Sequence, residues 1–111
     1  MNTTKIIEEV SLSKFKQIIS AYKSKIKLST HALDHLSDSQ RKVFKEEELI
    51  NPLLRETPRG IGLQKNGRYA VFFRKKEGYL RIIFEVTNDR LVIITFINTD
   101  TMPNLRRLQE E

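Results

Sequence analysis

Tight-turn signals divide the second half of the sequence into short segments of alternating hydrophobicity, and this pattern constrains the fold most. The first signal is Asn66-Gly67, a dipeptide typical of β-hairpin turns; Lys76-Glu77-Gly78 and Asn88-Asp89 mark the next two turns. Segments of this length with period-two alternation are typical of strands. The sequence therefore predicts four consecutive antiparallel strands, over residues 60–65, 68–74, 79–87 and 90–98.

Upstream of Pro58 the apolar residues recur at helical spacing instead. This spacing predicts a helix over about residues 13–24 and another over about residues 45–55, although Pro52 removes a backbone hydrogen bond from the latter. Between them, Ser29 and Thr30 are typical N-cap residues before a short third helix. We therefore expect an α+β fold, with N-terminal helices followed by an antiparallel four-stranded meander sheet.

The chain has 111 residues, which suffices for a single domain. We divide this domain into an N-terminal helical extension (1–27), a core (28–99) and a C-terminal tail (100–111), in which we expect a short helix from Pro103 onward. The first residues lack the pattern of a signal peptide, and no apolar run approaches the roughly 20 residues of a membrane span. We therefore expect a cytoplasmic protein.

The charge is concentrated in the predicted sheet. The whole chain has a formal net charge of +6, and residues 57–99 hold eight of its basic residues but only three acidic ones. Such an excess favours a polyanionic partner, and arginine can donate two hydrogen bonds at once to a phosphate. A membrane surface fits less well than a nucleic acid, because no basic amphipathic helix is apparent. We expect four basic residues to contact the RNA backbone: Arg59, Lys65, Arg74 and Lys75.

Both histidines of the chain lie on one predicted helical stripe. His31, Asp34, His35 and Asp38 follow one another at three- and four-residue spacing. The absence of cysteine excludes a Cys-ligated zinc site, and no further histidine completes a metal site, so we expect no metal or other cofactor. Two interpretations remain: the histidines perform acid–base catalysis, or they only cap and solubilise the helix.

The run from Leu28 to Leu36, which contains the sequence HALDH, resembles the opening "HA-x-x-R/H" motif of a family of small domains related to RelE-like toxins. The later segments 65–69, 79–83 and 91–96 are similar to the hairpins and closing strand of the same family, so residues 28–99 would be a RelE-like core. The chain departs from the family pattern in the segment that precedes the motif. The resemblance implies a sheet fold shared with barnase, EndoU and colicin, a metal-independent ribonuclease activity and an antitoxin or immunity protein as partner. The residues that match the family's site positions are His31, Arg68, Arg81 and Thr95, and His35 stands where many relatives have arginine or another polar residue.

Together these features predict a metal-independent, toxin-like endoribonuclease that cleaves tRNA or mRNA by acid–base catalysis. His31 and His35 would exchange protons, Arg68 and Arg81 would hold the scissile phosphate, and Thr95 would position the substrate. Two alternatives stay open. One is a nucleic-acid-binding module without catalysis, with Tyr69, Phe72 and Tyr79 as stacking platforms. The other is a small phage or plasmid regulatory protein that binds other proteins.

Overall fold

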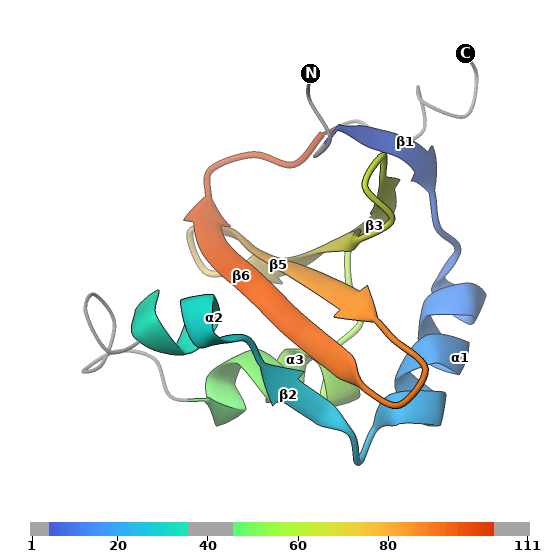
Figure 1. Ribbon diagram of the computed structural model, residues 1–111. Coiled ribbons are helices and arrows are strands. Elements are labelled where there is room, and N and C mark those ends of the chain that lie inside the picture. Colours follow the sequence, from blue (N-terminus) through green and yellow to red (C-terminus); the bar gives the residue numbers. More distant parts are fainter. Residues whose placement is uncertain (1–4, 36–45, 104–111) are drawn as a thin grey trace.

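The computed structural model describes residues 5–35 and 46–103. These residues form one six-stranded sheet and three helices (Figure 1). The strand order is β1-β3-β4-β5-β6-β2; every neighbouring pair is antiparallel except β6 and β2, which are parallel. In chain order the elements are β1 (Ile6–Glu9), α1 (Leu12–Tyr22), β2 (Ile26–Leu28), α2 (Thr30–His35), α3 (Glu47–Arg55), β3 (Gly60–Gln64), β4 (Tyr69–Lys75), β5 (Gly78–Val86) and β6 (Leu91–Thr99).

The expected RelE-like arrangement, with N-terminal helices followed by a four-stranded antiparallel meander, is wrong. The four predicted segments are strands β3 to β6, but β1 adds to β3 and β2 adds in parallel to β6, which gives a mixed six-stranded sheet. With four and three residues, β1 and β2 are too short to show a periodic pattern in the sequence. They form strands because the outer strands of the meander offer unpaired backbone N–H and C=O groups.

The N-terminal residues are therefore an integral part of the sheet. The only helix within the described part of the predicted helical extension is α1, where the Ser11 side chain accepts a hydrogen bond from the Lys14 backbone N–H at 3.1 Å and caps the first turn. The Tyr22 hydroxyl donates to the Thr87 carbonyl at 2.9 Å and ties the end of α1 to the β5–β6 turn. The predicted tail helix after Pro103 lies outside the described residues, as does Asp38.

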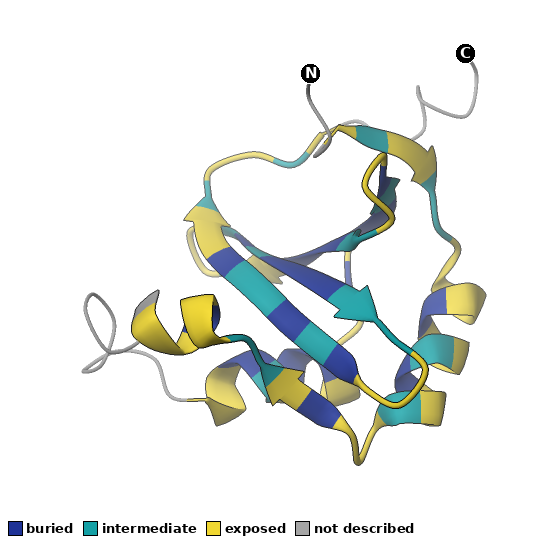
Figure 2. Ribbon diagram, in the orientation of Figure 1, coloured by how far each residue is buried: buried dark blue, intermediate teal, exposed yellow. Residues whose placement is uncertain are grey.

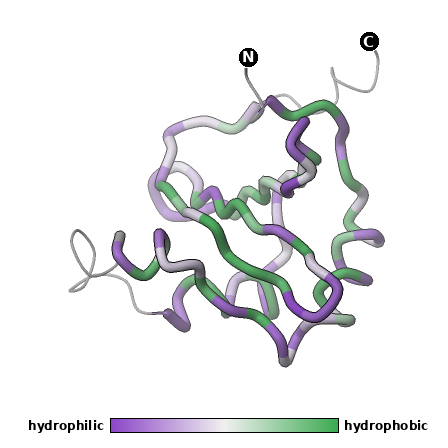
Figure 3. Tube along the Cα trace, viewed as in Figure 1, coloured by the Kyte–Doolittle hydropathy of each residue, from purple (hydrophilic) through white to green (hydrophobic). Residues whose placement is uncertain are grey.

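The helices cover one face of the sheet, and the main core lies between them and the strands (Figures 1 and 2). Phe15 of α1 meets Phe84 of β5 with ring centroids 6.4 Å apart, and Leu53 of α3 joins the same cluster. Phe84 is fully buried, and much of β5 and β6 is hydrophobic along its length (Figure 3). Removal of such a ring costs about 3–5 kcal/mol, so this contact is a large part of what holds α1 to the sheet.

A β-bulge in β6 changes which residues face the core. The pairing runs from Ile83 opposite Thr95 directly to Phe84 opposite Ile93, so Ile94 is the extra residue. Strict alternation predicts that Thr95 lies on the same face as Ile93. The bulge reverses this phase, and Phe96 instead joins Ile93 in the main core.

Both glycines in the β-turns have positive φ angles, but their surroundings differ. Gly67 has φ 88° and no neighbour near the position of a Cβ atom, whereas at Gly78, with φ 95°, a Cβ atom would collide with the Thr99 carbonyl. Asn66 has a negative φ, and its side chain accepts from the Arg68 backbone N–H at 2.9 Å. The first hairpin therefore uses a three-residue loop with Gly67 in the left-handed position rather than a two-residue turn.

Gly67→Ala and Gly78→Ala form a matched pair that separates backbone strain from steric crowding. We expect Gly67→Ala to cost about 1 kcal/mol, because only the left-handed conformation is penalised. We expect Gly78→Ala to cost about 3 kcal/mol, because the collision with Thr99 adds to that penalty. Urea denaturation of both variants measures the difference, and equal losses of stability would contradict the crowding at Gly78.

Candidate nucleic-acid interface

The sheet has a second face, opposite the helices, that carries four of the nine predicted site residues. Ala70, Phe72 and Ile83 form a small buried cluster there, against which Ile6 and Met102 pack. Met102 belongs to the segment that leaves β6 and runs toward β1 (Figure 1). We call this side the open face; the strand register places on it, among others, Arg68, Ala70, Phe72, Arg74, Tyr79, Arg81, Ile83, Glu85, Thr95 and Ile97.

Arg81 lies at the centre of the open face, opposite Phe72 on β4 and Ile97 on β6. Its side chain is half-buried, and its Nε atom is buried without a hydrogen-bond partner. Within the described residues the Arg81 side chain makes no hydrogen bond or ion pair. A buried donor without a partner costs about 1–3 kcal/mol, and an anion would recover this cost once the side chain turned its Nε toward the open face.

Arg74 and Tyr79 form a second cationic feature next to Arg81. They are directly opposite each other on β4 and β5, and the Arg74 guanidinium carbon lies 5.2 Å from the centre of the Tyr79 ring. Arg74 Nη1 also donates to the Gly78 carbonyl at 3.4 Å. Tyr79 precedes Arg81 by two residues, so the two features are about 7 Å apart along the strand.

Arg68 differs from the other two arginines because it has an acidic partner. Its Nε lies 3.3 Å from a Glu85 carboxylate oxygen, and both side chains are about 40% exposed (37% and 41%). An exposed pair of this kind contributes little to stability, but its carboxylate repels a phosphate and occupies the guanidinium. Glu85 was not among the predicted site residues, although the register of the β4–β5 hairpin places it directly beside Arg68.

Thr95 joins Arg81 on the open face because of the β6 bulge. It lies opposite Ile83, two residues along β5 from Arg81, and is half-buried. The structure thus brings together two residues of the proposed catalytic set, Arg81 and Thr95, and places Arg68 farther along the same face.

The two histidines belong to α2, which lies beyond β6 next to the edge strand β2. The predicted N-cap is confirmed: the Ser29 hydroxyl accepts from the Ala32 N–H at 3.0 Å and donates to the Ile94 carbonyl at 2.9 Å. His31 is exposed, and its imidazole makes no hydrogen bond or ion pair with Arg81, Thr95 or any other described residue. His35 ends the helix, and its side chain lies outside the described part of the structure.

The remaining predicted contacts are spread over the molecule. Arg59 precedes β3 and Lys65 lies in the β3–β4 turn, and both are exposed. Lys75 is on the helix side of the sheet, where its Nζ lies 3.0 Å from Glu56 Oε1. Tyr69 also faces the helix side and stacks on Phe84 with centroids 5.2 Å apart.

Only one of the three predicted stacking platforms is both on the open face and accessible. Phe72 is on this face but only 3% exposed, and Tyr69 is on the other face, so Tyr79 alone remains available. Among the described residues, the carboxyl group with a clearly shifted pKa is Asp89 in the β5–β6 turn, at the other end of β5 from Tyr79. The hydrogen bond from Thr87 and the charge of Arg90 lower this pKa.

Among residues 5–35 and 46–103, no three histidine, aspartate or glutamate side chains come close enough to hold a metal ion. The longest helix there, α1, has 11 residues, and none of the described helices can cross a bilayer. Comparisons with protein-family models, curated proteins and solved structures found no match for the chain.

Ser29→Ala tests whether this side chain holds α2 against β6. We expect a loss of about 2 kcal/mol in the free energy of unfolding, because one capping bond and one bond to Ile94 disappear together. Ser13→Ala, on the exposed face of α1, is the matched control and should change stability by less than about 0.5 kcal/mol. Chemical denaturation measures both; equal values for the two variants would disprove the anchoring role.

Proposed function

We propose that this protein binds single-stranded RNA on the open face of its sheet. The observation that carries the proposal is the central Arg81 guanidinium, which has no acidic partner among the described residues and leaves its Nε unsatisfied. A phosphate group supplies both the charge and the hydrogen-bond acceptors that this side chain lacks.

The neighbouring Arg74–Tyr79 pair supports a single strand as the ligand. A base that is free of a duplex can stack on a tyrosine ring or a guanidinium plane, and such stacking is worth about 1–3 kcal/mol per base. Arg81 and the Arg74–Tyr79 pair are about 7 Å apart along the strand, so the two cations can contact neighbouring phosphates of an extended RNA backbone. The Arg68–Glu85 pair lies at the other end of the face and contributes less, because Glu85 already neutralises Arg68.

Arg81→Gln should weaken binding of a fluorescein-labelled single-stranded RNA by about tenfold or more, because a charge-assisted contact contributes about 1.5–3 kcal/mol. The salt dependence should fall as well, by about 0.7 in the slope of log K against log salt concentration for each lost phosphate contact. Fluorescence anisotropy over a series of salt concentrations measures both quantities.

Lys14→Gln is the matched control, because it removes one positive charge from the exposed side of α1, across the sheet from the open face. Its affinity should stay within about twofold of the parent protein. If both variants weaken binding equally, the RNA responds to net charge alone and the open face is not the binding site.

As a second function we propose cleavage of the bound RNA, with the exposed His31 imidazole as the proton acceptor. This imidazole is exposed, and the Ser29 anchor fastens its helix to β6, the strand that carries Thr95. A histidine in such a place can accept the proton of a ribose 2′-hydroxyl, whose oxygen then attacks the adjacent phosphorus and expels the 5′-oxygen. Arg81 would stabilise the charge that develops on the phosphate oxygens.

RNA cleavage predicts that the protein degrades total RNA in the presence of EDTA, with 2′,3′-cyclic phosphate products. His31→Ala should lower the rate by about 100-fold or more while RNA affinity is kept, because it removes a proton acceptor rather than a phosphate contact. Gel analysis of the RNA, with a 2′-deoxy substrate as the negative control, provides the measurement. Equal rates for His31→Ala and the parent protein would exclude His31 as the base.

A further inference from the structure

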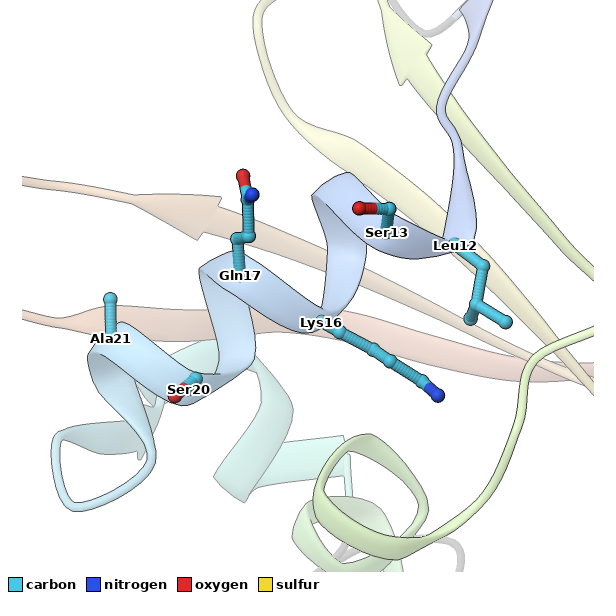
Figure 4. Close-up of a pocket in the computed structure, with 6 residues that line it drawn as sticks. All are labelled: Leu12, Ser13, Lys16, Gln17, Ser20 and Ala21. Atoms are coloured by element: carbon cyan, nitrogen blue, oxygen red, sulfur yellow. The ribbon is translucent and has the colours of Figure 1, made fainter.

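A groove between α1 and α3, on the side of the molecule away from the open face, has the features of a protein docking site. It has a volume of about 390 Å³ and continues onto the outer surface of α1. Figure 4 shows that Leu12 and Lys16 extend from α1 toward the same side, while Gln17 and Ala21 point elsewhere. On its other side the groove is lined by Leu53, Leu54 and Arg55.

The floor and walls of the groove are apolar. Phe15, Ile19 and Leu53 form the floor and are nearly fully buried. Leu12 and Leu54 stand on the two walls and remain 38% and 37% exposed. Exposed leucines on two facing helices mark a surface that gains free energy when an apolar partner covers it.

The rim of the groove is positively charged. Lys16, Lys23 and Arg55 line it, are exposed and make no ion pair with any described residue. The only acidic residue among its lining residues is Glu56, which is already bonded to Lys75 at 3.0 Å and 3.1 Å. Three unpaired cations therefore surround an apolar centre.

From this combination we infer that the groove binds an acidic amphipathic helix of a partner protein. Apolar side chains at i, i+3 or i+4, and i+7 of that helix would cover Leu12, Leu54 and the floor. Aspartate and glutamate on its flanks would pair with Lys16, Lys23 and Arg55. A flat anionic membrane fits less well, because the bilayer surface cannot reach a floor that lies between two helices.

This docking site is separate from the proposed RNA interface, since the sheet lies between them. A partner at the groove and RNA on the open face could therefore be bound at the same time. The site thus adds a protein partner to the proposed function and does not depend on it.

The test selects helical peptides from a displayed library against the full-length protein, with Arg81→Gln in place so that the open face contributes less. We expect the enriched peptides to combine a leucine or phenylalanine stripe with net negative charge. Amide chemical shifts of the protein should then change at Leu12, Lys16, Ser20 and Leu54 when a selected synthetic peptide is added.

Lys16→Glu combined with Lys23→Glu should weaken that peptide by about tenfold, because attraction is replaced by repulsion. A peptide whose glutamates are changed to lysines should bind this double variant with the lost affinity restored. A misfolded variant would bind neither peptide. Lys27→Glu, on the edge strand β2, is the matched control and should leave the affinity within about twofold.

Four outcomes would overturn the inference. The first is that the enriched peptides show no acidic bias. The second is that the chemical-shift changes lie outside the groove. The third is that no peptide is enriched while the protein binds phosphatidylglycerol vesicles in a way that depends on Leu12 and Leu54. The fourth is a concentration-dependent dimer in sedimentation that Leu54→Ser abolishes, because a second copy of the chain would then occupy the groove.

Discussion

The pairing of β5 with both β4 and β6 is the interaction on which the rest of the structure depends. β5 is nine residues long and buries side chains on both faces, with Leu80, Ile82 and Phe84 toward the helices and Ile83 toward the open face. A strand covered on both sides has its register fixed strongly, since a slip by one residue would exchange the two faces. This register places Phe84 under Phe15, Glu85 beside Arg68 and Tyr79 beside Arg74.

The same pairing explains why the open face is both apolar and charged. Its centre must be buried, because Ala70, Phe72 and Ile83 lie on the middle strands and are covered by Ile6 and Met102. Arginines can occupy the border of such a cluster because their aliphatic stems pack on it while the guanidinium stays accessible. Arg81 is the extreme case, with its Nε already withdrawn from water. An anion bound there would meet a guanidinium that is partly withdrawn from water, which strengthens the contact.

The two proposed binding surfaces follow from the two faces of one sheet. The helices that bury the main core also create a groove where α1 meets α3, and the only acidic residue among those that line it, in the described part of the chain, is the already paired Glu56. The open face has no helical cover in the described residues, so its arginines stay accessible. A domain of 111 residues can therefore present two separate cationic surfaces, one suited to a nucleic acid and the other to an acidic peptide.

By itself, the sequence determined the four strands of the meander, their turns, the cap at Ser29 and the concentration of positive charge on the sheet. These features depend on residues that are close together in the sequence, such as Asn66-Gly67 or the alternation along β5. Short sequence patterns therefore predict them. Only the tertiary structure decided that residues 6–9 and 26–28 are strands, because they pair with residues 62–64 and 91–93 far along the chain. It likewise decided, through the bulge at Ile94, that Thr95 lies beside Arg81, and through pairing with Glu85 that Arg68 is partly neutralised. Long-range pairing and register depend on the total burial of side chains on both faces of the sheet. This burial involves residues from the whole chain, so no short stretch of sequence predicts it.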